Sequence, residues 1–147
     1  MHLELDLNKI AKIPKQIGKL TQLRKLDLDY NKINKIPKEI GQLTLLKQLY
    51  LNNNLLTKIP DEIGQLTSLK ILRLEYNQIT EIPEQIGQLT LLEELRLHNN
   101  QIINITEEIY QLLSLDKLYL EDNPLSDESK NILELLSLKI SRVIYDY

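Results

Sequence analysis

The side chains best suited to binding or catalysis in this 147-residue sequence recur at a fixed interval of 23 residues and fill three columns. The first column contains Glu4, Asp27, Tyr50, Arg73, Arg96 and Tyr119. The second contains Asp6, Asp29, Asn52, Glu75, His98 and Glu121. The third contains Leu7, Tyr30, Asn53, Tyr76, Asn99 and Asp122. Because tyrosine and arginine are enriched at the energetic centres of protein interfaces, the columns predict a protein-binding face.

We predict that part of these columns forms a binding site for a protein partner. The site residues are Tyr30, Tyr50, Arg73, Glu75, Tyr76, Arg96, His98, Tyr119 and Glu121. In this interpretation the aromatic rings and guanidinium groups supply contact energy, and Glu75, His98 and Glu121 set specificity. The alternative is a solvated surface on which Arg73 and Arg96 merely pair with Glu75 and Glu94, since exposed ion pairs contribute only about 0 to 1 kcal/mol.

Other chemistry finds little support in the residues. The absence of cysteine rules out disulfides, thiolate metal sites and cysteine nucleophiles. The two histidines, His2 and His98, lie too far apart in the repeat to cooperate, and neither a phosphate-binding loop nor a two-histidine metal motif occurs. We therefore expect no enzyme activity and no cofactor.

An acidic group on the first two units raises the question of a bound cation. Its members are Glu4, Asp6, Asp27 and Asp29. Calcium prefers such oxygen ligands, but it needs a loop that wraps around the ion, and here basic residues adjoin carboxylates on rigid strands. We expect a solvated acidic patch and no metal site.

Charge is distributed unevenly along the chain, whose formal net charge is −3. Residues 1–45 hold nine basic and five acidic side chains, and residues 46–147 hold nine and sixteen. The basic excess comes mainly from Lys9, Lys12, Lys15, Lys19, Lys32, Lys35 and Lys38. No aromatic residues are interleaved with these lysines, so we expect a solubilising surface and no nucleic-acid partner.

The columns require a regular scaffold, and the same interval organises the rest of the sequence. Leucine and isoleucine supply 52 of the 62 apolar residues, which is typical of one packing arrangement repeated many times. The repeated positions are Pro14, Pro37, Pro60 and Pro83, then Gly18, Gly41, Gly64 and Gly87, and Asn8, Asn31, Asn54, Asn77, Asn100 and Asn123. Such a period predicts a solenoid in which each unit contacts only its neighbours.

Each position of the unit suggests a local structure. Leu26 and Leu28 flank Asp27 with the alternation of a strand, and successive units place these strands in parallel, roughly 4.8 Å apart. The amide of Asn31 can bond backbone groups at the following bend. Pro37 favours the first turn of a short helix, and we expect Gly41 to end that turn in a left-handed conformation.

The two ends of the chain differ. Thr106 and Tyr110 replace proline and glycine in the last full unit, which predicts a longer helix capped by Thr106. Residues 126–147 predict a cap made of a helix, with Ile132, Leu135 and Leu136 facing inward, and a terminal strand. We expect one domain: a truncated first repeat (1–22), four full repeats (23–114), a partial repeat (115–125) and the cap (126–147).

The amino-terminal unit has no comparable cap. Its core positions are Leu3, Leu5, Ile10, Ile13, Ile17 and Leu20. Solenoid ends need a polar cover, so we expect either further chain before Met1 or another chain on this end, including a homo-oligomer. No apolar run approaches the roughly 20 residues that cross a bilayer, so we expect no membrane insertion.

Residues 3–125 resemble the leucine-rich repeats, whose consensus L-x-x-L-x-L-x-x-N-x-[LI] the units follow. The IPxxIGxL continuation is similar to a 23-residue subclass found in bacterial proteins and in Ras-associated scaffolds. The resemblance implies an α/β solenoid with a parallel concave sheet, short convex helical turns and non-enzymatic protein binding. It also leaves open a cytosolic scaffold for a GTPase or phosphatase, and both a bacterial secreted or surface location, with the leader removed, and a cytosolic one.

Overall fold

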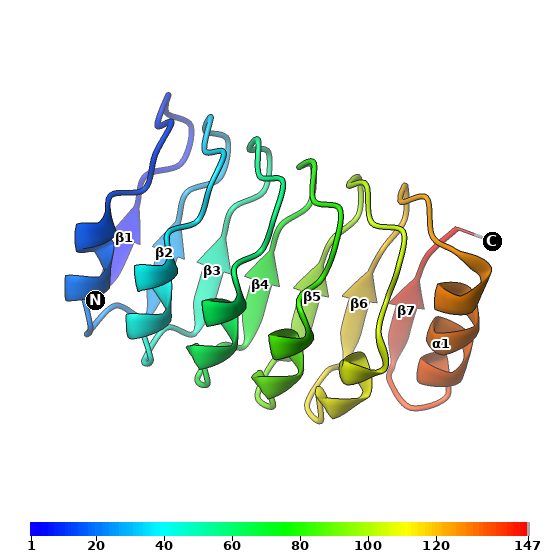
Figure 1. Cartoon of the computed structure of the whole chain (residues 1–147). Coiled ribbons are helices and arrows are strands. Elements are labelled where there is room, and N and C mark those ends of the chain that lie inside the picture. The colour runs from blue at the N-terminus through cyan, green and yellow to red at the C-terminus, as the bar shows by residue number, and fades with distance from the viewer. Residues whose placement is uncertain (147) are drawn as a thin grey trace.

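The structure is a computed structural model that describes residues 1–146. Tyr147, the last residue of the predicted cap, lies outside the described residues. Within residues 1–146 the chain forms one sheet of seven parallel strands in sequence order (Figure 1). The strands are β1 (His2–Glu4), β2 (Lys25–Asp27), β3 (Gln48–Tyr50), β4 (Ile71–Arg73), β5 (Glu94–Arg96), β6 (Lys117–Tyr119) and β7 (Arg142–Ile144).

The register of the sheet follows the repeat. Leu3 pairs with Leu26, and Leu26 pairs with Leu49, so equivalent residues of successive units lie side by side. The terminal strand β7 breaks the interval, because Leu118 of β6 pairs with Val143. The predicted solenoid with a parallel sheet, short helical turns and a carboxyl-terminal helix and strand is therefore confirmed.

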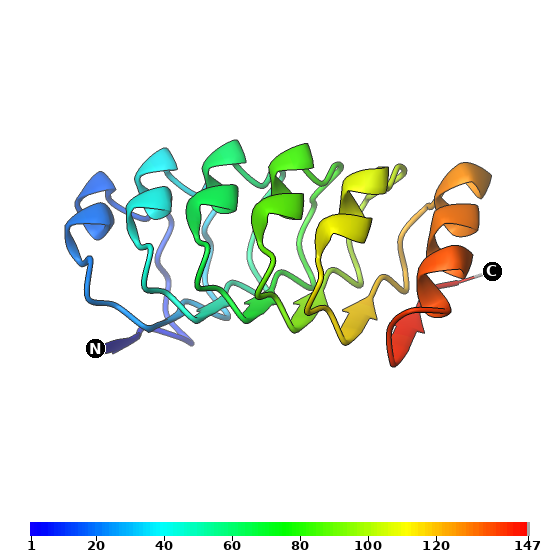
Figure 2. The same ribbon diagram turned by 90° about the horizontal axis from the view of Figure 1, so that it is seen from below.

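A short 3-10 helix crosses the side opposite the strands in each unit (Figure 2). These helices are η1 (Lys15–Lys19), η2 (Lys38–Gln42), η3 (Asp61–Gln65), η4 (Glu84–Gln88) and η5 (Glu107–Gln111). Proline precedes the first four; at Pro37 the backbone is extended, with φ −71° and ψ 148°, and its carbonyl accepts a hydrogen bond from the Ile40 amide at 3.0 Å. We call the two sides of the solenoid the strand face and the helix face.

The core between the two faces consists of leucine and isoleucine columns. Leu26, Leu49, Leu72 and Leu95 are fully buried. Burial of one such side chain stabilises a fold by about 1.5 to 3 kcal/mol, and each column repeats this contribution in every unit. Stability therefore grows by stacking units, because no unit encloses a core alone.

The predicted asparagine bend is confirmed and links neighbouring units. The Asn77 amide nitrogen donates to the carbonyl of Leu74 in its own unit and of Leu51 in the preceding unit, both at 3.0 Å. Its side-chain oxygen accepts from the Leu56 amide of the preceding unit at 2.9 Å. Asn54 and Asn100 repeat this pattern, so the asparagine column holds successive units in register.

The residue before each asparagine adopts a left-handed conformation, which the sequence analysis did not predict. These positions form the third column, Leu7, Tyr30, Asn53, Tyr76, Asn99 and Asp122, with φ between 53° and 56°. A residue other than glycine costs roughly 1 to 2 kcal/mol in this region. Tyr30 is held there because its amide donates to the Asn52 carbonyl of the next unit at 3.0 Å.

The predicted left-handed stop at glycine is wrong, because none of the glycines has a positive φ. Close approach of the next unit explains these residues instead: a Cβ on Gly64 would lie 2.6 Å from the Gln85 carbonyl oxygen. In the last unit α1 (Asp127–Ser137) replaces the next 3-10 helix and leaves room for Tyr110, whose hydroxyl donates to the Ile132 carbonyl at 3.0 Å.

The predicted longer helix after Thr106 is also wrong. η5 has the same length as the other 3-10 helices, and Thr106 makes no side-chain capping bond to it. The Leu112 amide donates to the Ile109 carbonyl at 3.3 Å, which ends the turn as in the earlier units. Because β6 pairs with β5 in the same 23-residue register as the earlier strands, the chain between η5 and β6 is too short for a longer helix.

The carboxyl-terminal cap forms as predicted, with a different inner face on its helix. Ser126 caps α1 by accepting from the Ser129 amide at 3.3 Å. Ser129 is buried and its hydroxyl donates to the Ile103 carbonyl, which turns Leu133 and Leu136 inward. Leu135, predicted to face the core, is 58% exposed for this reason. None of the described helices has the length and apolar character that crossing a bilayer requires.

Candidate functional site

The structure places the nine predicted site residues on the strand face and brings most of them together. Tyr50, Arg73, Arg96 and Tyr119 lie on four consecutive strands, in direct register. Tyr76 and His98 lie beside them in the other two columns. Tyr30 is separated from Tyr76 by the Asn53 unit, and its side chain is exposed at the edge of the face.

Stacking of cations on tyrosine rings holds the first column in place. The Arg73 guanidinium lies 4.8 Å from the centre of the Tyr50 ring, and Lys25 approaches the same ring at 5.3 Å. The Arg96 guanidinium lies 5.0 Å from the Tyr119 ring. Each contact of this kind contributes about 0.5 to 1 kcal/mol at an exposed site. These side chains are therefore ordered before any partner arrives.

Glu94 is a residue of this face that the predicted site omits. Its carboxylate accepts from Arg96 Nε at 2.6 Å and lies 3.5 Å from Arg73 Nη2. It therefore fixes both guanidinium groups at once. The alternative interpretation of the sequence names Glu94 and Glu75 as partners of the arginines. The pairing with Glu94 is confirmed, whereas Glu75 forms no ion pair with either arginine in the described residues.

An aromatic group adjoins this arrangement around His98. The His98 and Tyr76 rings meet edge to face, with centres 5.4 Å apart and an interplanar angle of 82°. The His98 and Tyr119 ring centres lie 6.4 Å apart at 66°. His98 thus joins the tyrosine and arginine row to the second and third columns.

The second column carries buried carboxylates. Glu75 is 7% exposed, and Asp29 accepts from the Asn52 amide at 2.8 Å. Burial raises the pKa of Asp29 to about 7, and the nearby carboxylates of Asp27 and Glu75 add to this rise, although the bond from Asn52 opposes it. Burial is thus the main reason why Asp29 holds its proton at a higher pH than an exposed aspartate.

The expected acidic patch at the amino end is partly neutralised. Lys25 Nζ lies 2.9 Å from Glu4 and 3.4 Å from Asp27. The hydrogen bond and charge of Lys25 lower the pKa of the exposed Glu4 carboxyl. Among the described residues, no group of three or more histidine, aspartate or glutamate side chains has an arrangement that could hold a metal ion.

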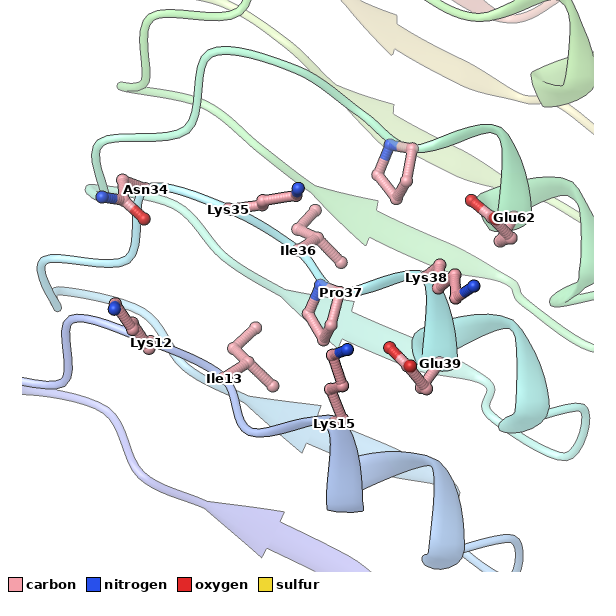
Figure 3. Close-up of a pocket in the computed structure, with 11 residues that line it drawn as sticks. Lys12, Ile13, Lys15, Asn34, Lys35, Ile36, Pro37, Lys38, Glu39 and Glu62 are labelled. Carbon is pink, nitrogen blue, oxygen red and sulfur yellow. The ribbon is translucent and has the colours of Figure 1, made fainter.

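The predicted solubilising lysines line a groove of about 530 Å³ outside the strand face (Figure 3). Lys12, Lys15, Lys35 and Lys38 surround it, together with Glu39 and Glu62. Ile13, Ile36, Pro37 and Pro60 supply its apolar lining. The groove brings flexible cations near carboxylates and lacks aromatic residues with which to stack a nucleobase.

The raised pKa of Asp29 predicts a pH-dependent stability with a definite sign. The folded state holds this proton more tightly than the unfolded chain, so its stabilising contribution is complete below about pH 3.8 and is lost as pH rises to about 7. For this half-buried group we expect a loss of about 1 to 2 kcal/mol after solvent screening.

Urea unfolding at a series of pH values checks this expectation. Relative to Asp29→Asn, the wild-type protein should lose stability between pH 4 and pH 7, whereas Asp61→Asn, at an exposed site on η3, should follow the wild-type curve. Parallel curves for wild type and Asp29→Asn would show that Asp29 is well solvated.

Known proteins resemble this chain in sequence and in fold. A family model described as a leucine-rich repeat region matches residues 1–75, and a second, described as leucine rich repeat, matches residues 67–125. A leucine-rich-repeat protein of Leptospira interrogans superposes with a TM-score of 0.93 at 37% identity, covering 100% of this chain and 37% of that one.

Two further solved structures come from other organisms. An Arabidopsis thaliana receptor kinase ectodomain, GASSHO1/SCHENGEN3, was solved in complex with CASPARIAN STRIP INTEGRITY FACTOR 2; it is 38% identical, with a TM-score of 0.79, and the match covers 84% of this chain and 16% of that one. An internalin of Listeria monocytogenes is 30% identical, with a TM-score of 0.78, and the match covers 96% of this chain and 39% of the internalin chain.

The chain thus spans well under half the length of these structures. No curated protein gives a significant match. The two family models together account for residues 1–125, and the consensus leucines and asparagines occupy their structural positions throughout that range. The chain belongs to the leucine-rich-repeat family.

Proposed function

We propose that this chain is a non-enzymatic protein-binding module whose strand face recognises a protein partner. The observation that carries the proposal is the row of tyrosines and arginines stacked in register across β3 to β6. Residues of these two types dominate the binding energy of many interfaces. The Arabidopsis ectodomain, crystallised with a protein ligand, supports the same class of function.

Order in the free protein favours binding at this row. Glu94 holds both guanidinium groups, and the tyrosine rings pack against them, so few rotamers remain to be lost when a partner binds. Six strands at roughly 4.8 Å make the face about 24 Å long. A standard interface buries about 800 Å² on each partner, which a face of this length can supply.

The helix face offers weaker contacts at most positions. It presents exposed lysine, glutamate and glutamine side chains such as Lys38, Glu84 and Gln88. These types lose more conformational entropy on binding and are depleted at interface centres. The contrast between the two faces leads to a direct test.

Removal of the stacked side chains should weaken partner binding while leaving the fold intact. We expect Tyr50→Ala or Arg73→Ala to weaken binding by at least about 1 kcal/mol. We expect stability to change by less than about 1 kcal/mol, because both side chains are partly exposed. Crosslinking or pull-down from the native source identifies the partner, and calorimetric titration then measures each variant.

Lys38→Ala and Gln88→Ala are the matched controls on the helix face, and both should bind as wild type does. A different site would be indicated if binding survived the strand-face changes and was lost when Ile103 or Leu113 was made polar. Both side chains are exposed apolar groups in the last full unit, at 51% and 81%. That result would move recognition away from the strand face.

Self-association through the amino-terminal end is the second candidate, and one specific observation favours it. Leu3, Leu5, Ile10 and Leu20 are only partly buried. They line an apolar cavity of about 310 Å³ at this end. A second copy covering them would remove apolar surface from water at about 25 cal/mol per Å².

Light scattering over a concentration series tests the second candidate. Self-association predicts a molecular mass that rises with concentration, and Leu3→Lys should abolish the rise by placing a charge in the contact. Leu138→Lys, at an exposed site beyond α1, should leave it unchanged. A constant monomer mass up to millimolar concentration would rule out self-association.

A further inference from the structure

The strand face contains two neighbouring stripes of different electrostatic character. The first is the row of stacked tyrosines and arginines. The second, which we call the acidic stripe, consists of Asp29, Glu75 and Glu121, with Asn52 and His98 between them. In each of these units but the last, the amide of the residue after the stripe position donates a hydrogen bond of 2.9 to 3.1 Å to the carbonyl of the stripe residue in the next unit. These bonds hold the five positions side by side.

The carboxylates of the acidic stripe have no cationic partner in the part of the chain that the structure describes. No lysine or arginine lies within ion-pair distance of Asp29, Glu75 or Glu121. The arginines of the neighbouring row are engaged by Glu94 instead. Within the described residues these three carboxylates therefore form no ion pair, and Arg73 and Arg96 act on Asp29 and Glu75 only from a longer distance.

Unsatisfied polar atoms mark the centre of the stripe independently of its charge. Glu75 is more than nine-tenths buried, and its Oε2 has no hydrogen-bond partner among the described residues. His98 Nδ1 and Glu121 Oε2, in the next two units, are also buried atoms without a hydrogen-bond partner among the described residues, although both side chains as a whole are only partly buried. A buried carboxylate oxygen without a partner is costly, so a ligand that supplies positive charge over it gains correspondingly.

The environment of Asp29 agrees with this interpretation. Burial, Asp27 and Glu75 raise its pKa to about 7 in spite of the bond from Asn52 and the charge of Arg73. Burial is the largest cause of this rise in pKa, and the charge of Glu75 adds to it from two units away. A cation placed over the stripe would interact favourably with both carboxylates.

The spacing of the carboxylates restricts the shape of the ligand. Asp29, Glu75 and Glu121 lie on every second unit, so strands roughly 4.8 Å apart separate them by about 10 Å. Three residues of an extended chain span about 10 Å, and three residues of a polyproline II helix span about 9 Å. The side chains of an extended strand alternate between two faces, so every third one points away from the stripe. A polyproline II helix has three residues per turn and can place every third side chain opposite one carboxylate.

We propose that the acidic stripe binds a polypeptide segment of the partner that runs across the strands as a polyproline II helix and carries lysine or arginine at every third residue. The inference rests on the proposed function and names the partner's chemistry at the same face. Arg73 and Arg96 repel a cation displaced toward the stacked row, so they set the register of the segment. The basic side chains of the segment lie over Glu75 and Glu121 and attract their carboxylates electrostatically, although the unpaired Oε2 atoms themselves are buried.

Short peptides test the spacing directly by fluorescence anisotropy at low salt. The probe is a labelled ten-residue peptide of serine and threonine with lysine at positions 2, 5 and 8. Its control has the same composition with the three lysines consecutive. We expect the spaced peptide to bind at least about tenfold tighter, because only its charges match all three carboxylates.

Variants of the protein locate the site on the stripe. Glu75→Gln and Glu121→Gln should each weaken the spaced peptide at least about fivefold. Glu84→Gln makes the same charge change on η4 and should have no effect. Glu75→Gln should melt at or above the wild-type temperature, since it removes a buried charge that forms no ion pair; this shows that weaker binding does not arise from misfolding.

Two outcomes would overturn the inference: equal affinity for the spaced and consecutive peptides, or affinity unchanged by both glutamate variants. The native partner separates this inference from the proposed function. If Tyr50→Ala and Arg73→Ala release the partner while Glu75→Gln and Glu121→Gln retain it, the inference alone fails. If all four variants retain it, the proposed function fails as well.

Discussion

The asparagine column is the constraint on which the rest of this structure depends. Each buried asparagine satisfies backbone groups of two units with one side chain, so a unit cannot slide relative to its neighbour without breaking these bonds. In the first five units the residue before the asparagine is held in a left-handed conformation by its own backbone bond to the next unit, as at Tyr76, whose amide donates to the His98 carbonyl at 3.1 Å. Strand register, helix spacing and the columns of the strand face all follow from this fixed stacking.

A rigid stack separates the demands of folding from those of recognition. The inward leucines and isoleucines repeat with little variation because every unit solves the same packing problem. The outward positions carry no such requirement and differ from unit to unit. Glu94 shows how this freedom is used: one carboxylate holds two arginines, while Glu75 and Glu121 in the second column each keep one oxygen without a hydrogen-bond partner among the described residues.

Much of the fold can be predicted from the sequence because its signals are local and periodic. Leu26 and Asn31 each show their role through spacing alone. The role of Gly64 cannot be read in this way. Glycine is needed there because the Gln85 carbonyl of the next unit approaches closely, and the sequence of one unit does not show this contact. Leu133 faces the core in place of the predicted Leu135, because the hydrogen bond from Ser129 to the Ile103 carbonyl fixes the rotation of α1 about its axis. The burial of Glu75 likewise depends on neighbouring strands, which the pattern of one unit does not contain.

The replacement Asn77→Ala tests the central claim most directly, measured as the change in the free energy of urea unfolding. The substitution leaves buried groups of two units without partners, so we expect a loss on the order of 1 to 3 kcal/mol, against a few tenths for Gln78→Ala at the exposed next position. Equal, small losses for the two variants would contradict the account, because they would mean that water replaces the asparagine amide and that the units keep their register without it.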